Sequence, residues 1–262
     1  MLQAIRRVDP SPSVDKQPKW DLRLVLRILS RRPFEPLGTC DEKWLTWKTA
    51  FLLLLGTACR RSELHALDWS SIEHPTDWSW VDLFTLPSFW AKHQASDADP
   101  TKPRVYRLKA LSSTSDPEEL KSCPVRALRC YMLRTEPRRQ GSKRLFLPIP
   151  PKTTNIHPNT VSSWIRQVIE YAYTHATSAD FKELQIPRHT PDLFRPAHEV
   201  RAISASVAWA SGNVSLRSLL QGCHWKSHTV FTDFYLRDIT VETQRGLSLA
   251  SRVLPGSTPL PQ

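Results

Sequence analysis

The chain has 262 residues, of which 40% are hydrophobic, so a sizeable core can form and disorder of the whole chain is excluded. The 36 lysines and arginines outnumber the 25 aspartates and glutamates, and this net charge of +11 favours a polyanionic partner, with nucleic acid before a membrane surface. The alternative is a basic, soluble protein with no such partner.

The cysteines and the apolar segments indicate the cellular compartment. The five cysteines form no CxxC pair, which argues against a disulfide framework or a zinc ribbon and fits a reducing environment. The beginning of the chain, MLQAIRRVDP, has no apolar core of signal-peptide length. The most apolar run, Ala50–Leu55, is too short to cross a bilayer. We expect a soluble intracellular protein that does not engage a membrane.

The N-terminal part of the chain is predicted to be helical after a proline-containing tail. Apolar residues occur on nearly all sides of the segment that follows Asp41, which is typical of a central buried helix. Asp21 and Asp41 are the predicted N-cap residues, because a carboxylate accepts hydrogen bonds from the first N–H groups of a helix. The predicted elements are a tail over residues 1–19, a helix over Leu22–Leu29, a linker over Arg31–Leu37, a helix from Asp41 to about Thr57 and a helical turn over Ser62–Leu67.

After Trp69 the pattern changes from helix to strand. Segments rich in aromatic and β-branched residues, or alternating in polarity, are separated by prolines and polar turns. They predict a small antiparallel sheet of about three strands, followed by a polar loop. The strands are expected at Trp78–Leu86, Ser88–His93 and Arg104–Leu108, and the loop at Ser112–Lys121.

The C-terminal half returns to helical periodicity. The clearest amphipathic pattern follows His157, where apolar residues repeat every three or four positions. A loop with prolines separates this segment from a helix that Pro196 opens. The expected helices are Pro124 to about Arg134, His157–Ala176, Pro196–Ala210 and Val214–Gln221. The predicted fold is therefore mainly α with one small antiparallel β-sheet, in the α+β class.

An arginine-rich segment at the end of the predicted central helix is a candidate anion site. The sequence TACRRSEL contains Arg60, Arg61 and Glu63. A half-buried guanidinium needs an anion or a carboxylate beside it. Arg60 therefore either faces a phosphate or forms an internal ion pair with Glu63.

A second candidate segment is RPAHEVR, which places His198 and Arg201 on one face near a helix N-terminus. Free N–H groups at such a terminus favour an anion. The alternative is a surface helix whose charges are balanced by Glu199. Lys92 lies where a predicted strand runs into a polar loop, and most lysines in such places are solvated.

The stretch Gly222–Asp238 combines aromatic and basic side chains, including His224, Trp225 and Tyr235. Tyr235 lies four residues after Phe231 and next to Phe234, a spacing typical of the rim of an apolar helix face. Taken alone, this stretch predicts a structural tyrosine.

Together these segments resemble the catalytic domain of tyrosine recombinases, the phage-integrase superfamily. Arginine, lysine, His-x-x-Arg, His or Trp, and tyrosine follow the family's order, with R-x-S-E-L at Arg60 and HEVR at His198. The segments FWAKHQ, CPVRALRCY, SWIRQVI, AHEVR and TDFYLRD more narrowly resemble the recombinases of DIRS/Ngaro-type retroelements and Crypton-like elements. The resemblance covers about the whole of Trp20–Asp238.

The resemblance implies breaking and rejoining of double-stranded DNA through a 3′-phosphotyrosyl intermediate, with no metal, cofactor or small-molecule substrate. Tyr235 would be the nucleophile and Lys92 the general acid that protonates the leaving 5′-oxygen. Arg60 and Arg201 would stabilise the phosphorane, because their planar forks suit phosphate oxygens. Arg61 is the alternative to Arg60.

Two further positions complete the implied site. His198, with an ordinary pKa near ~6.5, would assist proton transfer at the tyrosine. The family's usual Gly-His-Ser box is replaced by Cys223-His224-Trp225. Trp225 is the first choice for the residue that contacts the phosphate, and His224 is the alternative.

The resemblance also implies a homotetramer on DNA, a nuclear protein and a role in recombination or integration of a mobile element. Residues 20–238 would form the catalytic domain, with tails at 1–19 and 239–262. The family's N-terminal DNA-clamping domain would be missing or encoded elsewhere. The alternative function is that of a catalytically inactive DNA-binding remnant, or a domesticated protein, with the same fold.

Overall fold

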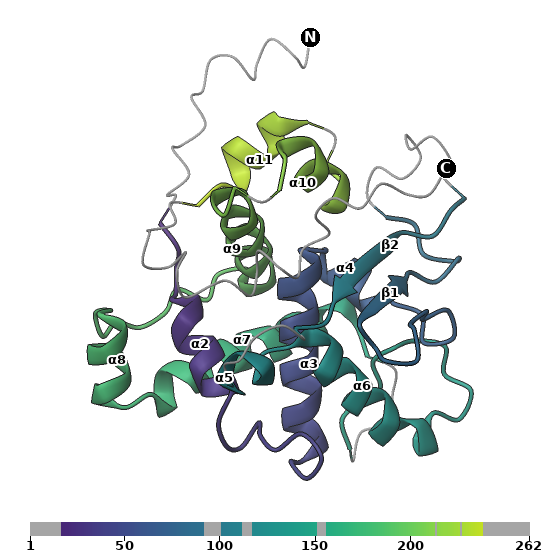
Figure 1. Cartoon of the computed structure of the whole chain (residues 1–262), viewed down its shortest axis with the longest axis horizontal. Coiled ribbons are helices and arrows are strands. Elements are labelled where there is room, and N and C mark those ends of the chain that lie inside the picture. Colours follow the sequence, from purple (N-terminus) through teal and green to yellow (C-terminus); the bar gives the residue numbers. More distant parts are fainter. Residues whose placement is uncertain are drawn as a thin grey trace.

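The computed structural model describes residues 17–91, 101–111, 117–150, 156–212, 214–225 and 227–237. This part of the chain is mainly helical with one small antiparallel sheet, as the sequence predicts (Figure 1). None of its helices is both long and apolar enough to cross a membrane. The elements in chain order are α2 (Leu22–Leu29), α3 (Glu42–Thr57), α4 (Arg61–His65), β1 (Trp80–Phe84), β2 (Val105–Lys109), α5 (Pro117–Lys121), α6 (Pro124–Thr135), the 3-10 turn η2 (Glu136–Arg138), α7 (Pro158–His175), α8 (Ser178–Leu184), α9 (Pro196–Ala210), α10 (Leu216–Gly222) and α11 (His228–Phe234).

Helix α3 runs through the middle of the molecule (Figure 1). Every residue from Leu45 to Thr57 is buried, and the helix packs against α6, α7, α9 and β2. Buried Lys48 donates to the carbonyl of Leu29 at 2.7 Å and to Glu35 at 2.5 Å, and Arg126 binds the same carboxylate. The prediction of a central buried helix is confirmed, because apolar residues on all sides need partners on all sides.

The helix ends show which capping predictions hold. The Asp21 carboxylate accepts hydrogen bonds from the N–H groups of Arg23 and Leu24, as predicted for the start of α2. Asp41 occupies the N-cap position of α3, but its side chain makes no capping hydrogen bond, so that part of the prediction is wrong. Helix α3 ends at Thr57, and the left-handed backbone of the next residue, Ala58, with a φ of 47°, turns the chain so that α4 begins only a few residues later.

Two strands, not three, form the sheet in the described part of the chain. Strands β1 and β2 pair antiparallel, with Leu83 opposite Tyr106. The expected strand at Ser88–His93 is not formed over residues 88–91, and its last two residues lie outside the described part. The reason is local: Pro87 has no N–H to donate, and Phe89 donates to the carbonyl of Leu86, which closes a turn instead.

Two short helices occur where loops were expected. Helix α5 occupies the end of the predicted loop at Ser112–Lys121. Helix α8 is set by a local capping pair, because Thr177 and Asp180 exchange backbone and side-chain hydrogen bonds. The Asp180 carboxylate also binds Arg31 of the segment after α2, which holds α8 in place.

Helices α9, α10 and α11 form a second packed group, which lies at the top of Figure 1. Their apolar side chains make a small core of their own, which includes Ala205, Leu219, Trp225 and Phe231. Helix α9 also contacts α3 and α7 and is buried on most sides, so the alternative of a surface helix is wrong. The alanines and serines of α9 are small, so the helix can pack against α3 and α7 and also against α10.

Candidate active site

Three arginine side chains surround the buried carboxylate of Glu63, which is 1% exposed. Arg60 donates from its backbone N–H at 2.6 Å and from Nη1 at 2.9 Å. Arg201 Nη1 lies 3.6 Å and Arg104 Nε 3.8 Å from the carboxylate oxygens. Burial by itself raises the pKa of Glu63, but the three guanidinium groups outweigh it and hold the pKa below the ordinary value of 4.5. The three guanidinium groups and this carboxylate form one buried cluster, which is called the arginine cluster below.

Arg60 and Arg61 have different environments. The reversal at Ala58 places Arg60 at the N-cap of α4, with its side chain against Glu63 and only 21% exposed. Arg61 follows on the outside of the helix and is exposed. The structure therefore brings Arg60, and not Arg61, into the arginine cluster.

Arg201 lies on α9, and its side chain is buried, with 1% of the residue exposed. Its Nη2 donates to the carbonyl of Cys223 at 2.7 Å. Within the described residues, Nε and Nη1 have no hydrogen-bond partner. A buried guanidinium with free donors needs an acceptor, and phosphate oxygens would supply one.

The ring of Tyr235 lies against this arginine. Tyr235 is the residue after α11, and its backbone carbonyl accepts a hydrogen bond from Ser206 of α9 at 3.2 Å. Arg201 Cζ is 5.3 Å from the centre of the tyrosine ring, and the ring of His198 stacks on it at 4.5 Å. The structure thus brings the candidate nucleophile, the histidine and one candidate arginine together.

The two phenylalanines near Tyr235 behave differently. Phe231 is 1% exposed and belongs to the small core, as expected of a structural residue. Phe234 is 51% exposed and therefore does not contribute to that core. Helix α11 has only seven residues, and it packs through the side that carries Phe231.

His198 does not have the ordinary pKa expected for it. Burial, followed by the positive charges of Arg201 and Arg237, lowers its pKa from 6.5 to about 4. Near neutral pH the imidazole is therefore uncharged. A neutral imidazole can accept a proton but has none of its own to give up as an imidazolium.

Trp225 and His224 occupy different sides of the site. The indole of Trp225 is 7% exposed, lies 4.8 Å from Arg201 Cζ and 4.6 Å from the Tyr235 ring. His224 adopts a left-handed backbone with φ of 51°, and its ring meets Tyr106 edge-on at 5.3 Å. Of the two alternatives, Trp225 lies beside Arg201 and the tyrosine.

Three further residues concern the site: one predicted residue, Lys92, and two that were not predicted, Arg104 and Arg237. Lys92 lies outside the described residues. Sequence reasoning missed Arg104, the residue before β2, although its alternation with Tyr106 in the predicted strand Arg104–Leu108 is a signal that it faces inward. It also missed Arg237, which forms a buried two-bond ion pair with Glu199 at 2.9 and 2.8 Å.

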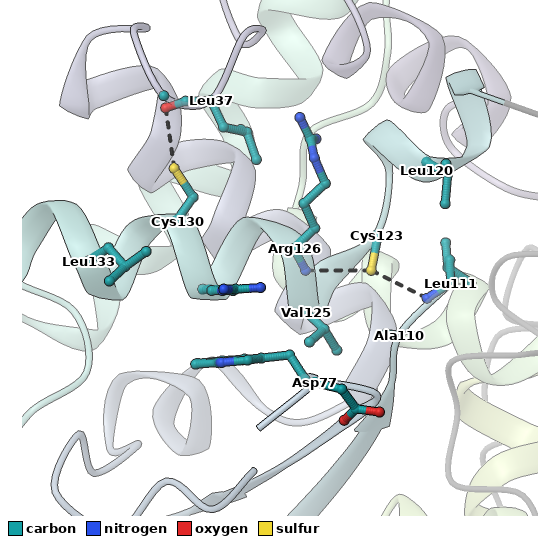
Figure 2. A pocket seen from close by; sticks show the side chains of 13 residues that line it. Leu37, Asp77, Ala110, Leu111, Leu120, Cys123, Val125, Arg126, Cys130 and Leu133 are labelled. Atoms are coloured by element: carbon teal, nitrogen blue, oxygen red, sulfur yellow. Dashed lines mark hydrogen bonds between the residues drawn. The ribbon is translucent and has the colours of Figure 1, made fainter. Parts of the chain in front are cut away.

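A separate cavity of about 510 Å³ lies beside α6 (Figure 2). Its lining is mainly apolar, with leucines at several positions. Cys123 Sγ accepts hydrogen bonds from the backbone N–H groups of Leu111 and Arg126, each at 3.4 Å, and Cys130 donates to the carbonyl of Leu37 (Figure 2). None of the described candidate residues lines this cavity. The candidate site is therefore the arginine cluster.

Comparison with known proteins bears on the fold. No family model and no curated protein matches this sequence. Among solved structures the chain is similar to the XerH site-specific recombinase bound to its difH substrate in a pre-cleavage complex, with a TM-score of 0.54 and 11% identity over 89% of this chain and 53% of that one. It is also similar to the XerA recombinase, with a TM-score of 0.49 and 16% identity over 90% of this chain and 64% of that one. The chain spans about half the length of the XerH chain, and the described part has the fold of a tyrosine-recombinase catalytic domain.

Proposed function

We propose that this protein is a tyrosine recombinase that breaks and rejoins DNA through a 3′-phosphotyrosyl intermediate. One observation carries the proposal: the ring of Tyr235 lies 5.3 Å from the guanidinium carbon of buried Arg201, whose Nε and Nη1 have no hydrogen-bond partner among the described residues. A tyrosine nucleophile needs a fixed positive field, because an isolated phenol ionises only near pH ~10. The likeness of the fold to that of a site-specific recombinase supports the same conclusion.

In the proposed reaction the Tyr235 oxygen attacks the scissile phosphorus. The bond between phosphorus and the 5′-oxygen breaks as the tyrosyl–phosphorus bond forms, so the number of phosphodiester links is conserved and no energy source is consumed. Arg60 and Arg201 donate hydrogen bonds to the non-bridging oxygens, where negative charge accumulates. The 5′-oxygen leaves with a proton, and Lys92 is the proposed donor.

His198 accepts the tyrosine proton in this proposal. Its ring stacks on Tyr235, and its lowered pKa of about 4 keeps it neutral before the reaction. Trp225 packs against both Arg201 and the tyrosine and shields them from water. His224, on the Tyr106 side, serves the structure of the turn.

The proposed partner is double-stranded DNA, bound by a homotetramer. The net charge of +11 supports a polyanionic partner. A cavity of about 710 Å³ lined by Arg138, Lys143 and Arg144 adds positive charge away from the arginine cluster. We further propose that residues 20–238 are the catalytic domain, and that the protein acts in the nucleus on a mobile element of the DIRS/Ngaro or Crypton type.

Covalent trapping on a nicked suicide DNA substrate tests the proposal. Wild-type protein is expected to form an adduct that resists denaturation, and Tyr235→Phe is expected to form none. Tyr171→Phe is the matched control, because Tyr171 stacks on His175 of α7, outside the arginine cluster. Arg60→Ala should abolish the adduct and Arg61→Ala should retain it. DNA binding with no adduct under any condition would instead support the inactive DNA-binding remnant.

A further inference from the structure

A second group of basic side chains lines the cavity of about 710 Å³ that follows α6 and η2. We call it the basic cavity, and its cationic lining residues are Arg138, Arg139, Lys143 and Arg144. No aspartate or glutamate is among the described residues that line it. Arg138 pairs with Glu42, which lies outside the lining. The other three cations give the cavity a positive charge, so it suits an anion.

Arg139 fixes the turn that carries Lys143 and Arg144. The residue is 8% exposed, and its Cζ lies 3.2 Å from the centre of the Trp69 ring. It donates to the carbonyls of Arg144 and Leu145 at 2.8 and 2.7 Å, while its Nε has no hydrogen-bond partner among the described residues. Burial lowers its pKa to about 10, so it is still charged near neutral pH. Its acceptors are uncharged and leave this positive charge in place.

The same turn is attached to the C-terminal end of α4. Arg144 Nη1 donates to the carbonyl of His65 at 3.1 Å and to its Nδ1 at 3.3 Å. The other ring nitrogen, Nε2, donates to the carbonyl of Ile156 at 2.8 Å, so this tautomer leaves Nδ1 as an acceptor. Burial, together with the charge of Arg144, lowers the pKa of His65 below 6.5 and keeps the ring neutral near pH 7. Neutral groups therefore hold Arg144, and its charge remains available.

Helix α4 sets the spacing between the basic cavity and the arginine cluster. Arg60 is its N-cap residue and His65 is its last residue. Its five residues span roughly 7.5 Å, at the usual rise of an α-helix. One strand of duplex DNA carries a phosphate about every 3.4 Å along the helix axis. Two phosphates a few nucleotides apart on one duplex fit this spacing, which favours the DNA backbone over a free anion as the occupant.

We propose that the basic cavity binds a backbone phosphate of the DNA, a few nucleotides from the scissile phosphate. Lys143 and Arg144 donate to its oxygens, and Arg139 holds the turn and adds its charge. Such a contact carries no sequence information, but it fixes the register of the duplex on the arginine cluster. This inference rests on the proposed function, since it takes the DNA of the proposed reaction as the occupant.

The salt dependence of DNA affinity tests the inference without cleavage. Affinity for an intact duplex is measured at several salt concentrations, with Tyr235→Phe as the parent protein so that no adduct forms. Lys143→Gln and Arg144→Gln should each reduce the slope of log affinity against log salt concentration by about 1, because each removes one phosphate contact. Lys182→Gln is the matched control: Lys182 is also an exposed lysine, but it lies on α8 and does not line the cavity, so the slope should not change.

Two further measurements separate the charge of Arg144 from a structural role and DNA from a free anion. Arg144→Lys keeps the charge and should keep the slope. A lower melting temperature in Arg144→Gln and Arg144→Lys, with both slopes unchanged, would show a purely structural arginine and overturn the inference. Unchanged slopes, with a phosphate-induced rise in melting temperature that Lys143→Gln loses, would show a site for free phosphate instead.

The outcome is distinct from that of the proposed function. If the protein with Tyr235 forms an adduct on nicked DNA but Lys143→Gln and Arg144→Gln keep the parent's slope, the inference is wrong and the proposed function stands. If no adduct forms but both variants reduce the slope, the proposed function fails and the basic cavity remains a contact for the DNA backbone.

Discussion

Replacing Glu63 by glutamine is expected to destabilise the fold strongly. The amide keeps the size of the side chain and removes the negative charge that lies among three guanidinium groups, two of which are almost fully buried. Breaking a buried ion pair by removing one partner costs about 3–5 kcal/mol, because the remaining charge is left uncompensated. For a domain of this size the loss corresponds to roughly 6–20 °C in melting temperature.

The effect of pH on this loss has a definite sign. The folded-state pKa of Glu63 is lowered below its ordinary value of 4.5. The ionised carboxylate therefore stabilises the folded state above about pH 4.5, and this contribution disappears as the pH falls through the folded-state pKa. The difference in stability between wild type and Glu63→Gln should be largest near neutral pH and should shrink in acid.

Urea denaturation at pH 7 and at decreasing pH measures both effects. Glu183→Gln is the matched control, because Glu183 pairs with Arg27 at 2.6 Å but is 61% exposed. Exposed pairs contribute about 0–1 kcal/mol, so this variant should remain close to wild type. Equal stability of the two variants at pH 7 would refute the argument, and so would a deficit of Glu63→Gln that does not shrink in acid.

Three further predictions concern the helices that hold Tyr235. By NMR, the imidazole of His198 in the free protein should remain neutral down to about pH 5, because its pKa is about 4; protonation near pH 6.5 would contradict this. Arg237→Gln should lower the free energy of unfolding by about 3 kcal/mol, because it removes the arginine that pairs with buried Glu199. A loss below about 1 kcal/mol would show instead that water compensates the carboxylate. Trp225→Ala should lower the free energy of unfolding by about 3–5 kcal/mol, because it leaves a cavity, and it should slow adduct formation. Trp225→Phe should recover most of the stability. Equal losses of stability in the two variants would argue against packing as the cause.

Local patterns were sufficient to predict most of the helices. Leu22–Leu29 has the predicted bounds because its N-cap and apolar positions are close together in sequence. Helix α8 was not predicted, because its capping residue Thr177 lies in a polar stretch and few of its side chains are buried. The expected strand at Ser88–His93 has strand-forming residues, but the turn after Pro87 prevails over residues 88–91.

Site residues could be predicted only where their order along the chain matched that of the tyrosine recombinases. The order of Arg60, His198, Arg201 and Tyr235 indicated a shared site, and the fold brings their elements together. Arg104 could not be recognised in this way, because an arginine on a strand is typical of a solvated face until its partner Glu63 is known. The lowered pKa of His198 also depends on charges from more than one element, which no spacing reveals.

Glu199 joins the first described segment of the chain to the last one. Its Oε1 accepts a hydrogen bond from the backbone N–H of Lys19 at 3.4 Å, and the same carboxylate holds Arg237. The first and last described segments therefore meet at one side chain, next to His198 on α9. A load applied at the first segment, from an attached domain or from a neighbouring subunit, can therefore reach the helix that carries His198 and Arg201 through the Glu199 carboxylate, and a load at the last segment can reach it through Glu199 and Ser206.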